Sequence, residues 1–172
     1  MRVFGKAVSS FAIAAGILVV LGGTARAANT FKKFQAVGGG TLTWHPAFTD
    51  CATLTCNAGL CFCFTFDGNV VGNVIGASTL SLQDSQSASA TPDGNGSDKV
   101  FPSSGYGIIT TSSGDTVLLE FTGHHYLGSD GLSRLIEGAY QVTGGTGKFA
   151  NTKGAGNIIF TQSVVSLTGT LK

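Results

Sequence analysis

Apolar and polar residues alternate with a period of two along most of the chain beyond residue 30, and no apolar stripe of helix length interrupts this pattern. Successive side chains of a β-strand point to opposite faces, so the alternation predicts strands that each have one apolar face. Gly, Asn and Asp break the runs in the manner of turns. We therefore expect an all-β domain.

The alternation predicts about eight strands. Tight turns are expected at Asp67-Gly68 and at Ser112-Ser113-Gly114. Because closing such a sheet removes its exposed edges, we predict an antiparallel β-barrel, with a β-sandwich as the alternative. The expected strands cover residues 34–44, 61–66, 69–83, 107–111, 115–122, 136–143, 154–162 and 164–171.

Residues 84–104 are rich in Ser, Asp, Gly and Asn and include two prolines, which predicts a polar loop. Oxygen-bearing side chains alternate from Asp93 to Asp98, as they do in calcium loops. Asp98 occupies the position that an EF-hand reserves for Gly, and Ser104 stands where its Glu belongs. This mismatch favours a solvated loop over a calcium site.

The first 27 residues have the features of a secretory signal peptide. Two basic residues precede an apolar run over Phe11–Leu21, and Ala25-Arg26-Ala27 forms a small-x-small cleavage signature. The run is short for a bilayer span, and no Cys lies near Ala27 to accept a lipid. We expect an exported, periplasmic or extracellular domain of residues 28–172 with no stable membrane anchor; an uncleaved anchor is the alternative.

Composition narrows the class of protein further. With 42% hydrophobic and 11% charged residues, the chain has enough apolar surface for one packed domain, and collagen, coiled coil and polar disorder are excluded. Removal of residues 1–27 leaves seven Lys and Arg against nine Asp and Glu, a net charge of about −2. Lys32-Lys33 is the only adjacent pair of cations, so we expect no nucleic-acid partner.

All four cysteines lie in a predicted Cys-rich loop over residues 51–63. In an exported chain, four clustered cysteines predict two structural disulfides with three connectivities. Cys61 and Cys63 share one face of an extended segment, so each is expected to bond back to Cys51 or Cys56. A metal site is disfavoured because the spacing lacks paired C-x2-C knuckles and no His lies in the cluster.

The most specific segment is GAYQVTGGTGKFA, which runs from Gly138 to Ala150 and continues through KGAG at residues 153–156. It resembles the hallmark G-x-Y-x-[IV]-x-G-G-T-G-[RK]-[FY] of the allene oxide cyclase and dirigent barrel superfamily, and the resemblance extends over residues 106–171. It implies an eight-stranded barrel with an apolar interior, which in plant relatives holds a reactive small molecule in one conformation. The matched residues are turn and packing positions, among them Gly144, Gly145, Thr146 and Gly147. No catalytic residue carries over.

The same glycines have the spacing of a dinucleotide-binding loop. A strand is expected after them, however, rather than the helix whose N-terminus would hold a pyrophosphate. A P-loop is excluded because Val142 occupies the position of its first Gly. We therefore expect neither a nucleotide nor a metal cofactor.

Few residues offer acid–base chemistry. Glu120 and His124 share one side of a strand whose other side is apolar, which favours a surface position over a shared place in the barrel mouth. His124 and His125 are neighbours on a strand and point apart, which argues against a two-histidine metal site. The candidate polar groups are Glu120, His125 and Tyr140.

The favoured function is the binding or orientation of a small apolar ligand inside the barrel. Its expected contacts are aromatic: Trp44, Phe62, Phe64 and Phe66. One alternative is a structural or interaction protein with a filled barrel, which includes assembly as a homo-oligomer. The other is an enzyme, a cyclase-like isomerase without metal or nucleotide that acts mainly by the shape of its pocket. No nucleophile and base pair stands out, so the enzyme ranks last.

The predicted disulfides have a direct test. Thiol titration of the unfolded, unreduced mature protein is expected to detect no free thiol, because all four cysteines are paired. The same titration after reduction supplies the control and should detect all four. Four reactive thiols before reduction would show that the prediction is wrong.

Overall fold

The computed structural model describes residues 30–45, 61–87, 91–92, 99–128 and 133–172, and nearly all of them lie in strands. None of the helices in these ranges is long and apolar enough to cross a membrane. The elements are β1 (Lys32–His45), β2 (Cys61–Gly72), β3 (Gly76–Ser87), β4 (Thr91–Pro92), β5 (Lys99–Thr111), β6 (Thr116–Leu127), β7 (Ser133–Gly145), the 3-10 helix η2 (Gly147–Phe149), β8 (Gly154–Phe160) and β9 (Val164–Leu171).

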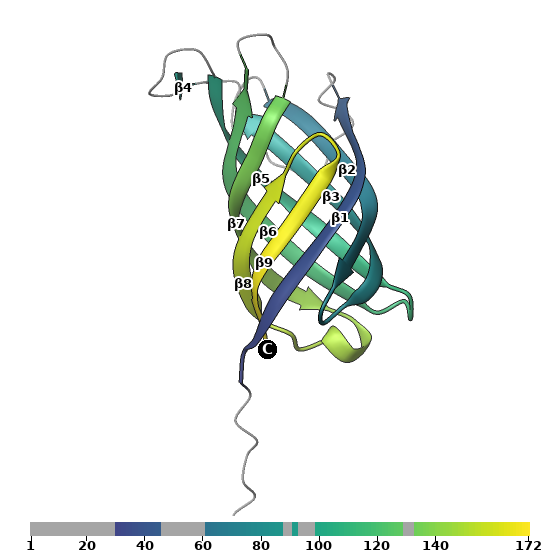
Figure 1. The fold of residues 1–172 in the computed structure, drawn as a ribbon. Helices are drawn as coiled ribbons and strands as arrows, with labels where there is room; N and C mark the ends of the chain where they lie inside the picture. The colour runs from purple at the N-terminus through teal and green to yellow at the C-terminus, as the bar shows by residue number, and fades with distance from the viewer. Residues whose placement is uncertain (1–29, 46–60, 88–90, 93–98, 129–132) are drawn as a thin grey trace, which may run out of the picture.

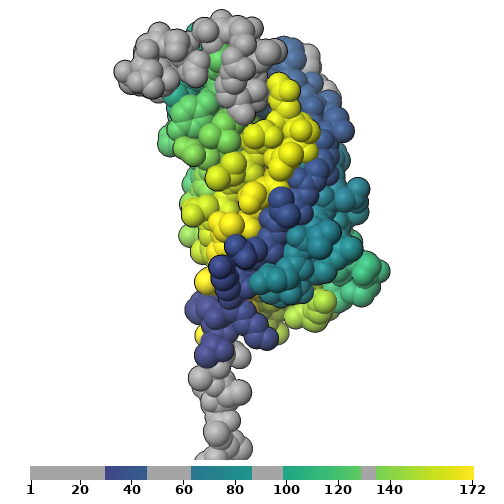
Figure 2. All heavy atoms as spheres, viewed as in Figure 1, coloured from purple at the N-terminus to yellow at the C-terminus, as the bar shows by residue number. Residues whose placement is uncertain are grey.

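Eight of these strands form a closed antiparallel barrel, as predicted, and a sandwich is excluded (Figure 1). Their order is β3-β2-β1-β9-β8-β7-β6-β5, and pairing of β3 with β5 closes the circle. The two-residue β4 pairs with β5 outside this circle. The wall is continuous where β1 lies beside β9 (Figure 2).

The barrel has two distinct ends. At one end, which we call the loop end, β1, β3 and β6 finish and β2, β5 and β7 begin. At the terminal end, β1 begins and β9 finishes, and short turns join β2 to β3 and β5 to β6 (Figure 1). The connection from β7 to β8, which contains η2, lies at this end too.

The barrel between its two ends is filled by its own side chains. Strand alternation places every second residue inside, and the Phe160 ring packs against the Phe66 and Phe121 rings at centroid distances of 6.3 and 6.1 Å. The buried apolar residues are Phe34, Ala36, Phe66, Val70, Ile75, Leu80, Leu82, Ile109, Val117, Leu119, Phe121, Ile136, Tyr140, Val142, Phe149, Ile158, Phe160, Val165, Leu167 and Leu171.

Inward-facing glycines make room for the largest of these side chains. A Cβ at Gly105 would lie 2.6 Å from the Phe121 ring, and one at Gly169 would lie 2.8 Å from the Tyr140 hydroxyl. Small residues opposite large ones let a narrow barrel reach close packing.

The predicted turn at Asp67-Gly68 is wrong. Strand β2 runs through both residues, and the chain reverses at residues 73–75. Gly76, which follows the turn, has a φ of 66°. Gly68 instead lies against β1, because a Cβ there would be 2.4 Å from the carbonyl oxygen of Gly39. Glycine at this position allows close strand contact rather than a reversal.

The predicted turn before β6 is correct. The Gly114 amide donates to the Thr111 carbonyl over 2.9 Å, and Gly114 has a φ of 84°. Gly144 and Gly145, predicted as turn residues, instead lie at the end of β7. In the connection that follows, over residues 146–153, Gly147 has a φ of 55° and opens η2, a single 3-10 turn that the sequence pattern does not reveal.

The polar loop predicted over residues 84–104 is wrong at both ends. Strand β3 continues to Ser87 and β5 begins at Lys99, so Asp84 lies in a strand and is buried. The composition is polar because the inner face of the barrel is itself polar at this level. The segment with alternating oxygen ligands, residues 93–98, lies outside the described residues.

Gly105→Ala is expected to destabilise the barrel by about 1–3 kcal/mol, since the added methyl overlaps the Gln83 carbonyl oxygen, 1.9 Å away, and the Phe121 ring. Gly144→Ala is the matched control because no atom lies within 4 Å of its Cβ position. Urea unfolding measures both. Equal midpoints for the two variants would contradict this account of the packing.

Candidate functional site

Four polar side chains point into the barrel at its loop end. Asp84 and Gln86 come from β3, Ser103 from β5 and His125 from β6, and they are only 1–6% exposed. Neighbouring inward positions closer to the middle of the barrel are apolar. The loop end therefore differs chemically from the rest of the interior.

Hydrogen bonds join these four side chains into one chain. The Ser103 hydroxyl donates to Asp84 Oδ1, and Gln86 Nε2 donates to Asp84 Oδ2 over 2.8 Å. Gln86 Oε1 lies 2.6 Å from His125 Nδ1. Because an amide oxygen only accepts, His125 Nδ1 must carry the proton in this arrangement. Donors thus point from His125 through Gln86 toward Asp84.

The Asp84 carboxyl is buried without a cation. Burial raises its pKa to about 7, and this effect outweighs the opposing hydrogen bonds from Ser103, Gln86 and the Ser85 backbone. No Lys or Arg of the described residues lies within ion-pair distance of it. The Asp84 carboxyl therefore titrates near neutral pH.

His125 lies between aromatic rings. The Phe64 ring meets it edge-on at a centroid distance of 5.3 Å, and the Phe101 ring centroid is 6.2 Å away. Burial lowers the pKa of His125 to about 4, so the imidazole is neutral at physiological pH. One polar chain and two aromatic walls thus meet at this end.

The structure separates the predicted aromatic contacts. Phe66 belongs to the filled core, whereas Phe64 lies opposite Asp84 on β3 and contacts His125. Trp44 is paired with Phe64 on an inward position of β1 but is 53% exposed, which places it at the rim. The side chain of Phe62 lies outside the described residues.

The structure also separates the three predicted polar groups. His125 joins the buried chain. Glu120 is exposed on the outer wall, so it does not share a site with His125, and the exposed His124 lies on the same outer face. Tyr140 is 1% exposed in the packed interior, where burial raises its pKa to about 12 and its hydroxyl has no hydrogen-bond partner.

Asp84, Gln86 and Ser103 are the residues that the sequence analysis missed. The signal is the alternation itself, because Leu80 and Leu82 are followed at the same period by Asp84 and Gln86. The polar residues from Asp84 onward are typical of a loop, so the predicted strand ended at residue 83, whereas β3 continues to Ser87.

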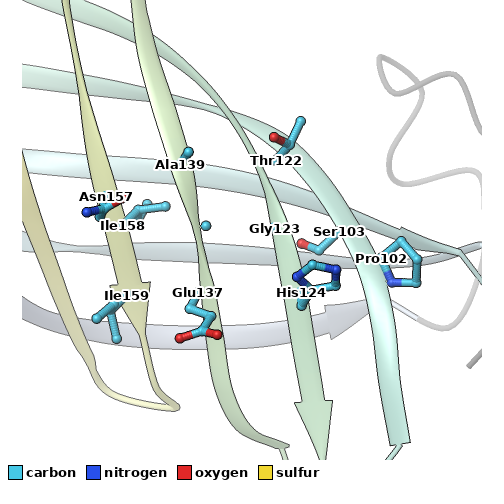
Figure 3. A pocket seen from close by; sticks show the side chains of 11 residues that line it. Pro102, Ser103, Thr122, Gly123, His124, Glu137, Ala139, Asn157, Ile158 and Ile159 are labelled. Carbon is cyan, nitrogen blue, oxygen red and sulfur yellow. The ribbon is translucent and has the colours of Figure 1, made fainter. Parts of the chain in front are cut away.

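A groove of about 690 Å³ crosses the outside of the barrel over β5 to β8 (Figure 3). His124, Glu137 and Ile159 lie side by side across β6, β7 and β8, and the Tyr126 hydroxyl donates to Glu137 Oε1 over 2.9 Å. Gly123 and Ala139 also line the groove. Its lining includes Ser103, a member of the buried polar chain, which pairs with Gly123 across β5 and β6.

The cysteines remain largely outside the described residues. Cys63 is 4% exposed and interacts with a partner that lies outside the described residues. The disulfides therefore stay a prediction. Within the described ranges, no group of three or more His, Cys, Asp and Glu side chains is placed to hold a metal ion.

Comparisons of the chain with protein-family models, curated proteins and solved structures returned no match. The resemblance to the allene oxide cyclase and dirigent superfamily therefore remains a prediction.

The buried chain predicts opposing effects of pH. Asp84 has a pKa of 3.8 when unfolded and about 7 when folded, so it makes the free energy of unfolding fall as pH rises from about 4 to 7. His125 shifts from 6.5 to about 4, so its contribution rises with pH between about 4 and 6.5. In Asp84→Asn the free energy of unfolding should therefore rise with pH over this range, because only His125 titrates. In His125→Gln it should fall, because only Asp84 titrates; each change is on the order of 3 kcal/mol.

Urea unfolding across this pH range measures the two profiles. Tyr140→Phe is the control, because the Tyr140 hydroxyl does not ionise in the window and lies outside the buried polar chain. Parallel profiles for Asp84→Asn and His125→Gln would show that the two groups do not titrate as described.

Proposed function

We propose that the protein is an exported barrel that binds a small ligand at its loop end. The observation that supports this function is the buried Asp84 carboxyl, held by Ser103 and Gln86 without a described cation in an interior lined mainly by apolar side chains. Export rests on the predicted signal peptide over residues 1–27.

The cost of burying a carboxyl argues for a role beyond packing. Charged or unpaired polar groups destabilise a core, and apolar side chains of similar size serve packing at least as well. Strongly shifted pKa values gather at functional sites for this reason. A barrel with a purely structural role has no need of a polar chain from Ser103 to His125.

The surroundings indicate the chemical class of ligand. Phe64 and Phe101 offer apolar walls and Trp44 an aromatic rim, which suit an apolar body. A carboxylate in the ligand would meet Asp84 without a described cation between them, so repulsion disfavours an acid. We therefore propose an apolar molecule with one hydroxyl or carbonyl group that hydrogen-bonds to the polar chain.

A structural barrel is the second candidate, and the packed middle of the interior favours it. Residues such as Phe66, Tyr140 and Phe160 leave the ligand only the loop end. The two candidates differ in what the purified protein carries.

Native mass spectrometry of the protein from its own exported fraction is expected to detect a stoichiometric small molecule, released on denaturation and then identified. Asp84→Asn should lose most of it, whereas Tyr140→Phe, which removes a polar atom from the packed interior, should keep it. Circular dichroism verifies that both variants fold. The identified molecule then serves to test for conversion, the outcome that would make the protein an isomerase.

Retention of the molecule by folded Asp84→Asn would place the site elsewhere. A protein that carries no molecule and is not stabilised in thermal unfolding by a panel of lipids and phenolics would favour the structural barrel.

A further inference from the structure

Five of the six lysines whose side chains the structure describes gather at the terminal end of the barrel. They come from three segments that are distant in sequence: the start of β1, the connection from β7 to β8, and the end of the chain after β9. The five are Lys32, Lys33, Lys148, Lys153 and Lys172. The sixth, Lys99, begins β5 at the loop end.

Strand pairing and backbone hydrogen bonds bring these segments together. Lys32 pairs with Leu171 in the β1–β9 register, and Lys153 and Lys172 exchange two backbone hydrogen bonds of 3.1 and 2.7 Å. A hollow of about 460 Å³ lies among Lys32, Lys148 and Lys172. No acidic side chain lines this hollow.

Few acids offset these charges. Asp115, in the turn between β5 and β6, lies against the Gly147 backbone and accepts a hydrogen bond of 3.0 Å from the Ser113 hydroxyl. Of the other described acids, Asp67, Glu120 and Glu137 lie within wall strands, and Asp84 is enclosed at the opposite end. The terminal end is therefore a positive face on a domain whose expected net charge is slightly negative.

An exposed aromatic ring accompanies the lysines. Phe31 is 56% exposed, and Lys172 Nζ lies 5.4 Å from its ring centroid. Basic side chains around an exposed aromatic are typical of surfaces that rest on lipid headgroups, where the charges meet anionic lipids and the ring enters the interface. A soluble polyanion would use the charges but would leave the ring in water.

The covalent order of the chain points the same way. Thr30, beside the hollow, follows directly on residues 1–29, which include the apolar run of Phe11–Leu21. A membrane-bound apolar run would therefore be joined to the barrel at its terminal end.

We propose that the terminal end of the barrel is a docking surface for an anionic lipid bilayer, with Lys32, Lys148, Lys172 and Phe31 at its centre. The association is reversible and electrostatic, because a basic residue near an anionic surface strengthens binding about fivefold and salt screens the attraction. The surface lies opposite the proposed ligand site, so either proposal can fail without the other.

The test is sedimentation of the protein with phosphatidylcholine vesicles that contain or lack about one third phosphatidylglycerol. We expect binding only to the anionic vesicles and its loss at high salt. Lys148→Gln should weaken partitioning about fivefold, and the matched control Lys99→Gln should leave it unchanged. Both variants carry the same amino terminus as the parent protein, so any contribution of residues 1–29 cancels.

The combined variant Lys32→Gln, Lys148→Gln and Lys172→Gln should bind anionic vesicles no better than neutral ones, with an unchanged thermal unfolding midpoint. Equal binding to neutral vesicles, or an equal effect of Lys99→Gln, would overturn the proposal. Retention on heparin without binding to anionic vesicles would assign the surface to a soluble polyanion and also overturn it.

Discussion

Pairing between β3 and β5 closes the barrel. It turns a sheet with two open edges into a barrel and thereby divides every strand into an inner and an outer face. The pairing also brings Gln86 opposite Ser103 across the seam, with Asp84 two residues before Gln86 in β3. The polar chain is therefore built at the closure of the barrel, between strands joined by a long connection in sequence.

Closure explains why the carboxyl has unusual properties. An Asp on the outer face of β3 would meet water, whereas Asp84 exchanges that water for one hydroxyl, one side-chain amide and one backbone amide. These three donors do not restore what hydration supplied, so its pKa rises. His125 loses water in the same enclosure, and its pKa falls because burial disfavours the charged form of either group. Burial in the same enclosure thus favours the uncharged forms of Asp84 and His125 over an ion pair between them.

The packed middle of the barrel keeps its two ends independent. The Phe66, Phe121 and Phe160 rings lie in the buried core between the polar chain and the terminal end. The proposed ligand site and the proposed docking surface therefore lie on opposite sides of this packed layer. Coupling between the two would require the packed rings to rearrange, which close packing opposes.

From the sequence alone, alternation predicted an all-β antiparallel fold of about eight strands, with a sandwich still open beside the barrel, and the turn at Gly114, because alternation and turn glycines are local signals. Alternation correctly placed Phe64 and Phe66 on one face. It wrongly predicted a turn at Gly68 and a loop at Asp84, because glycine and polar residues occur both in strands and in connections. Which polar residues are enclosed, and where the lysines gather, follows from the three-dimensional fold. Both depend on contacts between distant segments, which alternation along one strand does not encode.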